Sequence, residues 1–298
     1  MSPSASADGI PWRTFLAEAE RRFAAADLPS PSVDARRIVE RASGYEGAEL
    51  ALGLGEPATQ RGVHFFDVMV ERRLQGEPLQ YVLGEWSFRT LDLMVDRRVL
   101  IPRPETEQVV EQALLELDRL RARREGEPLT VVDLGTGSGA IALSIAAERP
   151  GVDVWATDAS SDALDVAQAN LAGLGRAGRR VRIAEGSWFA ALPDDLRGRI
   201  DLIISNPPYV AEADDLPAEV RDHEPRVALI PGPTGREALD HLVSTAPAWL
   251  APHGVLVVEL APDQAAEVAA FATGHGFASV SIAPDLTGRD RMVIARRP

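Results

Sequence analysis

The residues with the clearest chemical potential are Asn206, Pro207, Pro208 and Tyr209, which follow the apolar run DLIIS. Such a run predicts a buried strand of a parallel sheet, and open α/β sheets bind their ligands beyond the carboxyl ends of these strands. The side-chain oxygen of Asn206 and the carbonyl oxygen of Pro207 can each accept one N–H bond from an NH2 group. Tyr209 can pack its ring over a planar amide or base. We therefore predict that Asn206, Pro207 and Tyr209 are catalytic and that all four residues bind an acceptor nitrogen.

This tetrapeptide suits methyl transfer to an amide or aromatic amine, which is a poor nucleophile because its lone pair is delocalised. Acceptance of two N–H bonds raises the electron density on nitrogen as charge develops, which stabilises the transition state selectively. Pro207 and Pro208 restrict the backbone before the acceptor arrives. No strong general base is required, since the proton can leave to solvent. The alternative is that NPPY only makes a rigid turn.

A glycine-rich loop, Gly135, Thr136, Gly137, Ser138 and Gly139, follows the apolar run TVVDL and precedes a helical pattern. Glycines allow backbone amides to approach a ligand without interference from Cβ atoms. The same residues with Ala140 also fit the looser GxGxxA form of the dinucleotide fingerprint. The loop is therefore predicted to bind either S-adenosylmethionine or NAD.

Asp158 ends the next apolar run, VDVWATD, about 20 residues after the loop. A carboxylate at this position can accept hydrogen bonds from both ribose hydroxyls of an adenosine. The alternative is that Asp158 caps the following helix, but Ser160 and Ser161 are better placed to do so. We predict that Asp158 binds the cofactor.

Two further residues lie near this predicted site. Asp133, just before the loop, can orient the loop through backbone amides or approach the methionine part of the cofactor. Trp188, after the run VRIAEG, can place its indole face against the adenine ring. The alternative for Trp188 is simple packing at the edge of the domain.

The first 80 or so residues show helical spacing of apolar side chains. We predict one helix from Trp12 to Phe23, a second from Pro31 to Gly44, and a third over 58–75. WSFRTLDLMVDRRVL (86–100) indicates a β-hairpin, and Pro104 is well placed to begin the next helix. The predicted domains are a helical substrate-recognition domain (1–84), a hairpin linker (85–101) and a catalytic domain (102–298).

Beyond Pro128, apolar strands alternate with helical segments, which predicts a mostly parallel sheet covered on both faces. The last two strands, ASVSIA and RMVIAR, are joined by PDLTGRD and should add an antiparallel edge. The predicted fold class is α/β, a Rossmann-like sheet of seven strands with a small N-terminal helical bundle.

Composition limits the possible functions. The 298 residues contain 45% hydrophobic and 26% charged side chains, which is typical of a globular protein. No apolar run approaches the ~20 residues that span a bilayer, and the start lacks a basic region followed by an apolar one, so a cytoplasmic protein is expected. Zero cysteines and no paired spacing among the five histidines predict that no metal is bound. The net charge of -14 disfavours nucleic acid as a partner.

The segment after the tetrapeptide, 211–226, contains six carboxylates and two arginines. We call it the acidic segment. One hypothesis is that it borders the acceptor and steers a protein partner rather than a phosphate backbone. The alternative is that it is only a solvated loop.

Six stretches together resemble the HemK/PrmC family of peptide chain release factor N5-glutamine methyltransferases. The resemblance covers about three quarters of the chain in the correct order and includes the helical N-terminal region. These stretches are GEPLQYVLGEWSF (76–88), VLIPRPETE (99–107), VVDLGTGSGAIALS (131–144), ISNPPYV (204–210), EPRVAL (224–229) and TGRDRMV (287–293).

The resemblance implies methyl transfer from S-adenosylmethionine, with S-adenosylhomocysteine as product, to the glutamine of the GGQ motif in bacterial class I release factors. It assigns the glutamine site to the four NPPY residues. A release factor is thus the predicted partner, and a monomer is expected. It assigns the cofactor site to Gly135, Thr136, Gly137, Ser138, Gly139, Asp158, Trp188 and Asn206.

Three other functions remain open at this stage. The acceptor could be a glutamine of a large-subunit ribosomal protein, since a similar sister group methylates one. It could be the amino group of a flipped nucleic-acid base, because NPPY also occurs in adenine and cytosine amino-methyltransferases. A non-catalytic protein that binds NAD through the glycine-rich loop is the third alternative.

Overall fold

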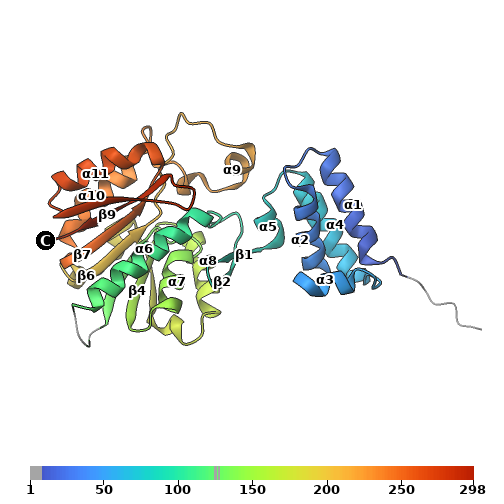
Figure 1. The fold of residues 1–298 in the computed structure, drawn as a ribbon, viewed down its shortest axis with the longest axis horizontal. Coiled ribbons are helices and arrows are strands. Elements are labelled where there is room, and N and C mark those ends of the chain that lie inside the picture. The colour runs from blue at the N-terminus through green and yellow to red at the C-terminus, as the bar shows by residue number, and fades with distance from the viewer. Residues whose placement is uncertain (1–8, 124–125, 127) are drawn as a thin grey trace, which may run out of the picture. The chain divides into compact units, whose positions relative to one another are not determined.

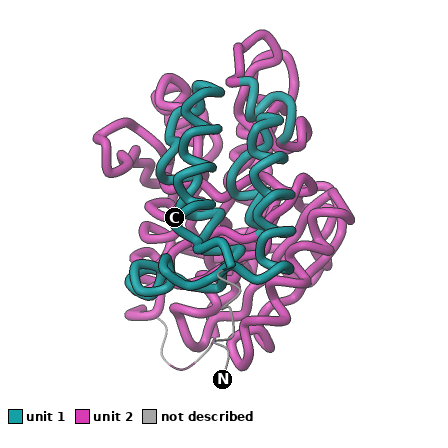
Figure 2. The backbone as a smooth tube through the Cα atoms, turned by 90° about the vertical axis from the view of Figure 1, so that its right-hand side faces the viewer, with its two compact units in different colours: residues 1–84, 218–223 teal, residues 85–217, 224–298 magenta. Residues whose placement is uncertain are grey.

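The computed structural model describes residues 9–123, 126 and 128–298. The chain forms two compact units (Figure 2). Unit 1 comprises residues 1–84 together with Ala218–His223, and unit 2 comprises Glu85–Pro217 and Glu224–Pro298. Each unit has a core of its own, so each is described separately below.

Unit 1 is helical (Figure 1). A single apolar core, which includes Trp12, Phe23, Ile38, Phe66 and Val70, joins the longer helices. This core confirms the predicted bundle and follows from the helical spacing of these apolar residues. The helices are α1 (Trp12–Ala25), α2 (Pro31–Ser43), α3 (Gly47–Gly53), α4 (Gln60–Leu74), α5 (Leu79–Leu83) and, from the later segment, α9 (Ala218–His223).

Unit 1 contains short helices that were not predicted, α3 and α5, because five to seven residues are too few to show a helical period.

The buried guanidinium of Arg73 in α4 connects several segments of this unit. It donates to Asp34 Oδ2 of α2 at 2.7 Å and to the backbone oxygen of Glu77 at 2.9 Å. It also pairs with Glu219 of α9 at 2.9 Å, which ties this segment to the helical core.

Unit 2 is an α/β domain whose sheet has the strand order β5-β4-β3-β6-β7-β9-β8. A separate hairpin, β1 (Glu85–Phe88) with β2 (Leu91–Met94), confirms the predicted hairpin, but it ends at Met94, and residues 95–100 are not strand. The strands of the sheet are β3 (Leu129–Leu134), β4 (Val152–Asp158), β5 (Val181–Glu185), β6 (Ile200–Ser205), β7 (Leu250–Glu259), β8 (Ser279–Pro284) and β9 (Asp290–Arg296).

Helices cover both faces of this sheet (Figure 1). Along β3, Val131 faces a core shared with α6 and α7, and Val132 faces a second core shared with α10 and α11. This alternation explains why the strands are apolar throughout. The helices are α6 (Pro104–Arg121), α7 (Ala140–Glu148), α8 (Ser161–Ala172), α10 (Glu237–Thr245) and α11 (Ala265–Gly274). Short 3₁₀ helices are η1 (Ala177–Arg180), η2 (Trp188–Ala191), η3 (Asp194–Leu196), η4 (Arg226–Ala228), η5 (Ala246–Ala248) and η6 (Pro262–Gln264).

The sheet is parallel from β5 to β7 and becomes antiparallel at β9. The two predicted antiparallel strands are therefore present, but they do not follow β7 across the sheet in chain order. The final strand, β9, lies between β7 and β8, and β8 forms the edge. The chain order reverses at β3, which has β4 on one side and β6 on the other, and this reversal creates the crevice where open α/β sheets bind ligands. In the part of the chain that the structure describes, no helix combines the length and apolarity needed to cross a membrane.

Candidate functional site

A cavity of about 560 Å³ lies at the carboxyl ends of β3, β4, β5 and β6. This volume falls within the range of roughly 300–1,000 Å³ that small-molecule sites usually have. Eight of the residues predicted from the sequence line it. They are Gly135, Thr136, Gly137, Ser138, Asp158, Trp188, Asn206 and Pro208. Gly139, Pro207 and Tyr209 are not among the lining residues.

The glycine-rich loop uses most of its amides to hold its own shape. The N–H groups of Gly135 and Thr136 both donate to the carbonyl oxygen of Thr157, at 2.9 and 2.8 Å. Gly139 has φ +85°, and a Cβ there would lie 2.9 Å from Leu143 Cδ1. Gly139 thus packs closely against α7 at the start of that helix. The loop therefore has fewer free amides to offer a ligand than the sequence analysis expected.

Asp158 links β4 to the glycine-rich loop. Its Oδ2 accepts from Gly137 N at 2.9 Å, and its Oδ1 accepts from Ser160 N at 3.0 Å. The capping of α8 is done by Ser160, whose Oγ accepts from Ala163 N, so Asp158 is not needed as a helix cap. A carboxylate oxygen can accept more than one hydrogen bond, which leaves Asp158 able to receive hydroxyl donors from the cavity.

Asp133 is fully buried at the end of β3 and orients the loop. Its Oδ2 accepts from Thr136 Oγ1 at 2.6 Å and from Ala142 N at 3.1 Å. Its Oδ1 has no partner among the described residues. Burial is the main reason that the pKa of Asp133 is raised to about 7, with the charge of Asp158 adding to the shift. This carboxyl group is absent from the cavity lining, which favours its role in shaping the loop.

The raised pKa of Asp133 predicts how stability depends on pH. The folded protein keeps the Asp133 proton up to pH about 7, whereas the unfolded chain loses it near pH 4. Stability from this group is therefore complete below pH ~4 and is lost as pH rises through ~7, at up to ~1.4 kcal/mol per pH unit. In denaturant titrations from pH 5 to 8, wild type should lose free energy of unfolding relative to Asp133→Asn. A difference that is constant with pH would contradict this.

Trp188 begins η2, separated from the end of β5 by two residues, and its ring reaches toward the glycine-rich loop. Its backbone has φ +49°, an uncommon conformation for a large side chain. An added Cβ at Gly135 would lie 3.6 Å from Trp188 Cζ3, so the indole packs close to the start of the loop. The indole therefore forms one wall of the cavity, consistent with a flat ring lying against it.

The Asn206 side chain is held by a buried hydrogen-bonded chain. Its Nδ2 donates to Thr106 Oγ1 at 3.2 Å, and that hydroxyl donates to Glu259 Oε2 at 2.7 Å. Thr106 is 3% exposed and Glu259 is 1% exposed. Burial raises the pKa of Glu259 to about 7. The side-chain oxygen of Asn206 accepts no hydrogen bond from the described residues.

The remaining residues of the tetrapeptide lie around Asn206. Pro207 is buried, whereas Pro208 lines the cavity. The Tyr209 ring packs on the core beneath α10 and α11, and its hydroxyl lies 3.5 Å from Glu259 Oε1. Burial raises the pKa of Tyr209, so this phenol remains protonated at neutral pH. The expected stacking of Tyr209 over an acceptor is not tested by this arrangement.

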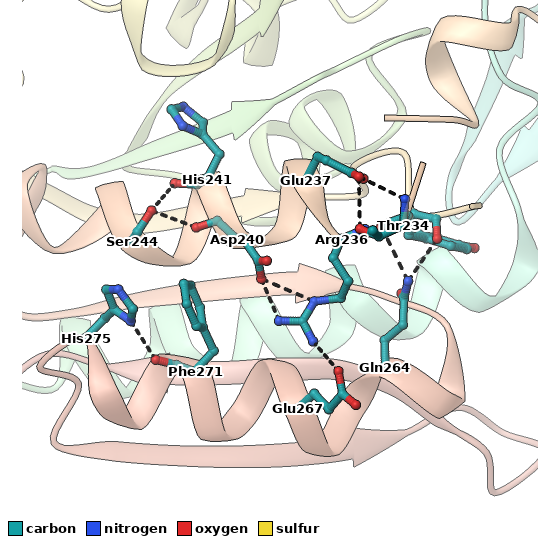
Figure 3. Close-up of polar contacts among 12 residues, drawn as sticks. Thr234, Arg236, Glu237, Asp240, His241, Ser244, Gln264, Glu267, Phe271 and His275 are labelled. Atoms are coloured by element: carbon teal, nitrogen blue, oxygen red, sulfur yellow. Dashed lines mark hydrogen bonds and ion pairs between the residues drawn. The ribbon is translucent and has the colours of Figure 1, made fainter. Parts of the chain in front are cut away.

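The end of the tetrapeptide is held from outside by α10, α11 and the loop before them. Gln264 Nε2 donates to the carbonyl oxygen of Tyr209 at 3.0 Å and to that of Gly235 at 3.4 Å. Figure 3 shows the Gln264 side chain reaching toward this loop and shows Arg236 between Asp240 and Glu267. The Arg236–Asp240 pair lies at the start of α10, and the Arg236–Glu267 pair joins this helix to α11. The backbone position of Tyr209 is thus fixed by residues distant in sequence.

Several lining residues were not predicted from the sequence. The segment 97–100 and Thr106 contribute to the cavity, and so do Pro225, Val227 and Ala228. Glu259 ends β7 at the same sheet edge as Asp158 and Asn206, so the rule that identified those residues could also have identified Glu259. Thr106 lies in the first turn of α6, where nothing in the local pattern distinguishes it.

The acidic segment is less free than its composition indicates. Glu212 pairs with Arg226 and Asp222 pairs with Arg221. Glu219 pairs with Arg73 in unit 1, and the buried Glu224 pairs with Arg103 in unit 2. Paired carboxylates contribute little to long-range attraction, which weakens the steering hypothesis for this segment.

The architecture of the chain is similar to that of a solved catalytic domain. The catalytic domain of hMettl16, solved in complex with the MAT2A 3′UTR hairpin 6, aligns with a TM-score of 0.52 at 15% identity, covering 78% of this chain and 81% of that chain. A model of the methyltransferase small domain matches residues 112–221. Unit 2 therefore has the fold of a class I S-adenosylmethionine-dependent methyltransferase, and the chain is an enzyme of the methyltransferase class.

Sequence relatives identify the family more narrowly. A release factor glutamine methyltransferase of Cereibacter sphaeroides is 42% identical over 95% of this chain and 97% of its own length. One of Xylella fastidiosa is 43% identical over 89% of this chain and 93% of its own length. A model of the PrmC N-terminal domain matches residues 14–84. The chain belongs to the release factor glutamine methyltransferase family, as the resemblance predicted.

Proposed function

We propose that this protein methylates the side-chain nitrogen N5 of the glutamine in the GGQ motif of class I release factors, with S-adenosylmethionine as methyl donor. The observation that carries this proposal is the orientation of Asn206. Its NH2 group is bound by Thr106, which leaves its oxygen to accept an N–H bond at the cavity. Names of relatives that span nearly the whole chain support the release factor as acceptor.

The residues around the cavity fit the proposed cofactor. A carboxylate, Asp158, can accept the hydroxyl donors of a ribose, and the indole of Trp188 offers a flat apolar wall for an adenine. Gly135 and Gly137 have positive φ and leave that part of the loop without side chains. S-adenosylmethionine supplies an electrophilic methyl group on a sulfonium sulfur.

The chain's own residues orient and activate the acceptor. Asn206 Oδ1 and the Pro207 carbonyl oxygen accept the two N–H bonds of the glutamine amide, which fixes the plane of the amide. As positive charge develops on nitrogen, its N–H groups become stronger donors to both oxygens, so these two hydrogen bonds stabilise the transition state more than the ground state. Pro207 and Pro208 hold this arrangement without further ordering.

Cofactor affinity should depend on Asp158. Replacing Asp158 with Ala removes acceptors for the ribose hydroxyls and the bond to Gly137 N. Hydrogen bonds to charged groups contribute roughly 1.5–3 kcal/mol, so the Kd for S-adenosylhomocysteine should rise about 10- to 100-fold. Calorimetry measures this directly. Asp165→Ala on the exposed side of α8 is the matched control and should leave the Kd unchanged. Equal affinity of Asp158→Ala and wild type would exclude this role.

Unit 1 is the candidate for substrate recognition, since a three-residue GGQ motif offers little surface for selection. The predicted boundary after residue 84 coincides with the end of the N-terminal part of unit 1. The predicted boundary at residue 101 stays a prediction. Cytoplasmic location and a monomeric state stay predictions.

The acceptor can be identified by competition. Purified protein with labelled S-adenosylmethionine would be offered a release factor, a large-subunit ribosomal protein and DNA together, and mass spectrometry would locate the label. Label on the GGQ glutamine is expected. Label on the ribosomal protein or on a base would replace the proposed acceptor, and binding of NAD instead of S-adenosylhomocysteine would remove the proposed cofactor.

A further inference from the structure

We propose that Thr106 and Glu259 are positioning residues that fix which way the Asn206 amide faces. This inference rests on the proposed function, because it concerns the same acceptor site. The three side chains come from separate elements of unit 2: the first turn of α6, the end of β7 and the residue after β6. Their contacts form one chain, from Asn206 Nδ2 to Thr106 Oγ1 and from Thr106 Oγ1 to Glu259 Oε2.

The direction of these two hydrogen bonds follows from the single proton that the Thr106 hydroxyl can donate. A threonine hydroxyl has one proton and can accept two hydrogen bonds. Because Thr106 Oγ1 donates its proton to Glu259 at 2.7 Å, only lone pairs of Thr106 face Asn206. Asn206 must then present its NH2 group to Thr106. The Asn206 oxygen is thereby directed away from Thr106.

The orientation matters because the two ends of a carboxamide have opposite hydrogen-bonding character. With the oxygen toward the acceptor, Asn206 accepts an N–H bond. With the amide turned by half a rotation, its NH2 group would face the NH2 group of the acceptor, and no hydrogen bond could form. Without Thr106 the side chain would therefore lose part of its preorganisation for the acceptor.

Glu259 is suited to anchor these hydrogen bonds because it is buried and because its two oxygens contact different side chains. Oε2 accepts from Thr106, and Oε1 lies 3.5 Å from the Tyr209 hydroxyl. The two ends of the tetrapeptide, Asn206 and Tyr209, are thus connected to the same carboxyl group. Oε2 remains an acceptor when Glu259 is ionised and also when its proton resides on Oε1, and in both states Thr106 donates to Glu259.

Three variants test whether the Thr106 hydroxyl, and not the size of the side chain, positions Asn206. Thr106→Val keeps the size of the side chain and removes the hydroxyl, whereas Thr106→Ser keeps the hydroxyl. Glu259→Gln keeps an oxygen that can accept from Thr106. At saturating cofactor and acceptor, Thr106→Val should lower kcat about tenfold, which equals ~1.4 kcal/mol. Thr106→Ser and Glu259→Gln should stay within about threefold of wild type. Equal losses in the Val and Ser variants would overturn the inference.

A double variant tests whether Thr106 acts through Asn206. In an Asn206→Ala background the amide is absent, so adding Thr106→Val should change kcat by less than about twofold. A further tenfold loss in that background would show that Thr106 acts by another route. Because Thr106 also lines the cavity, the Kd for S-adenosylhomocysteine is measured for each variant and should remain within about threefold.

Nuclear magnetic resonance tests the orientation without any activity. The chain contains two asparagines, Asn170 and Asn206, so selective ¹⁵N-asparagine labelling gives two side-chain NH2 signals. Asn170 Nδ2 donates to the backbone oxygens of Met94 and Ser138, at 3.0 and 2.8 Å, and serves as an internal control. Thr106→Val should shift the Asn206 signal and leave the Asn170 signal in place. An unchanged Asn206 signal would overturn the inference.

These measurements distinguish the inference from the proposed function. The label experiment identifies the acceptor, and its result decides the proposed function alone. The kcat ratio between Thr106→Val and Thr106→Ser is measured on whichever acceptor the wild type labels, and the NH2 signal needs no acceptor. A release factor that receives no label would therefore leave the positioning test intact.

Discussion

Replacing Asn206 with Ala should lower kcat about 100- to 1,000-fold while the protein keeps its fold. The variant removes the side-chain oxygen that accepts one of the two N–H bonds of the acceptor. Loss of one such acceptor or donor in comparable preorganised sites costs ~2.7–4 kcal/mol of transition-state stabilisation. Single-turnover kinetics with labelled cofactor measures the chemical step, and thermal unfolding reports whether the fold is retained.

A control variant lies in the same tetrapeptide. Tyr209→Phe keeps the ring on its core and removes only the hydroxyl, whose contact with Glu259 is long at 3.5 Å. Its kcat should stay within about threefold of wild type. Wild-type kcat in Asn206→Ala would exclude the role assigned to this side chain, whatever the result for Tyr209→Phe.

Replacing Gly235 with Ala should both destabilise the protein and impair turnover. Gly235 has φ +76°, and a Cβ there would lie 2.6 Å from the Tyr209 carbonyl oxygen and 2.9 Å from Ala211 N. These contacts are with backbone, so the end of the tetrapeptide must move. Displacement of about 1 Å in a catalytic arrangement can cost ~100-fold in rate, and we expect a loss of that size. The free energy of unfolding should fall by ~3 kcal/mol or more.

Gly288 provides the matched control for this prediction. It has φ +82° but no atom within 4 Å of an added Cβ. Gly288→Ala should therefore cost only the strain of a left-handed backbone, ~1–2 kcal/mol, with kcat unchanged. Denaturant titrations and kcat measurements on both variants separate conformational strain from steric displacement. Equal behaviour of the two variants would show that contact with Tyr209 is unimportant.

The parts of the site that could be predicted from the sequence are those in which neighbouring residues act together. The glycine-rich loop and the tetrapeptide are continuous stretches after apolar strands, and both lie at the carboxyl edge of the sheet. Asp158 was found by the same reasoning because a strand end fixes its location. The bundle and the parallel sheet followed from the spacing of apolar residues.

The parts that could not be predicted depend on contacts between distant residues. Thr106 reaches Asn206 across 100 positions and Glu259 across 153 positions. Gln264 reaches the Tyr209 carbonyl across 55 positions. Local spacing contains no information about such pairs. The pairing of Glu219 and Glu224 with arginines could not be predicted for the same reason.

The position of β9 between β7 and β8 has a consequence for how the protein is made. As the chain leaves the ribosome, β8 emerges with no sheet neighbour, and the edge of β7 stays unpaired until β9 follows. Unpaired strand edges invite aggregation, and pairings that wait for later residues slow folding. Translation that stalls just before β9 should therefore yield an incomplete chain that needs chaperones. Every residue of the cavity has already been synthesised by then.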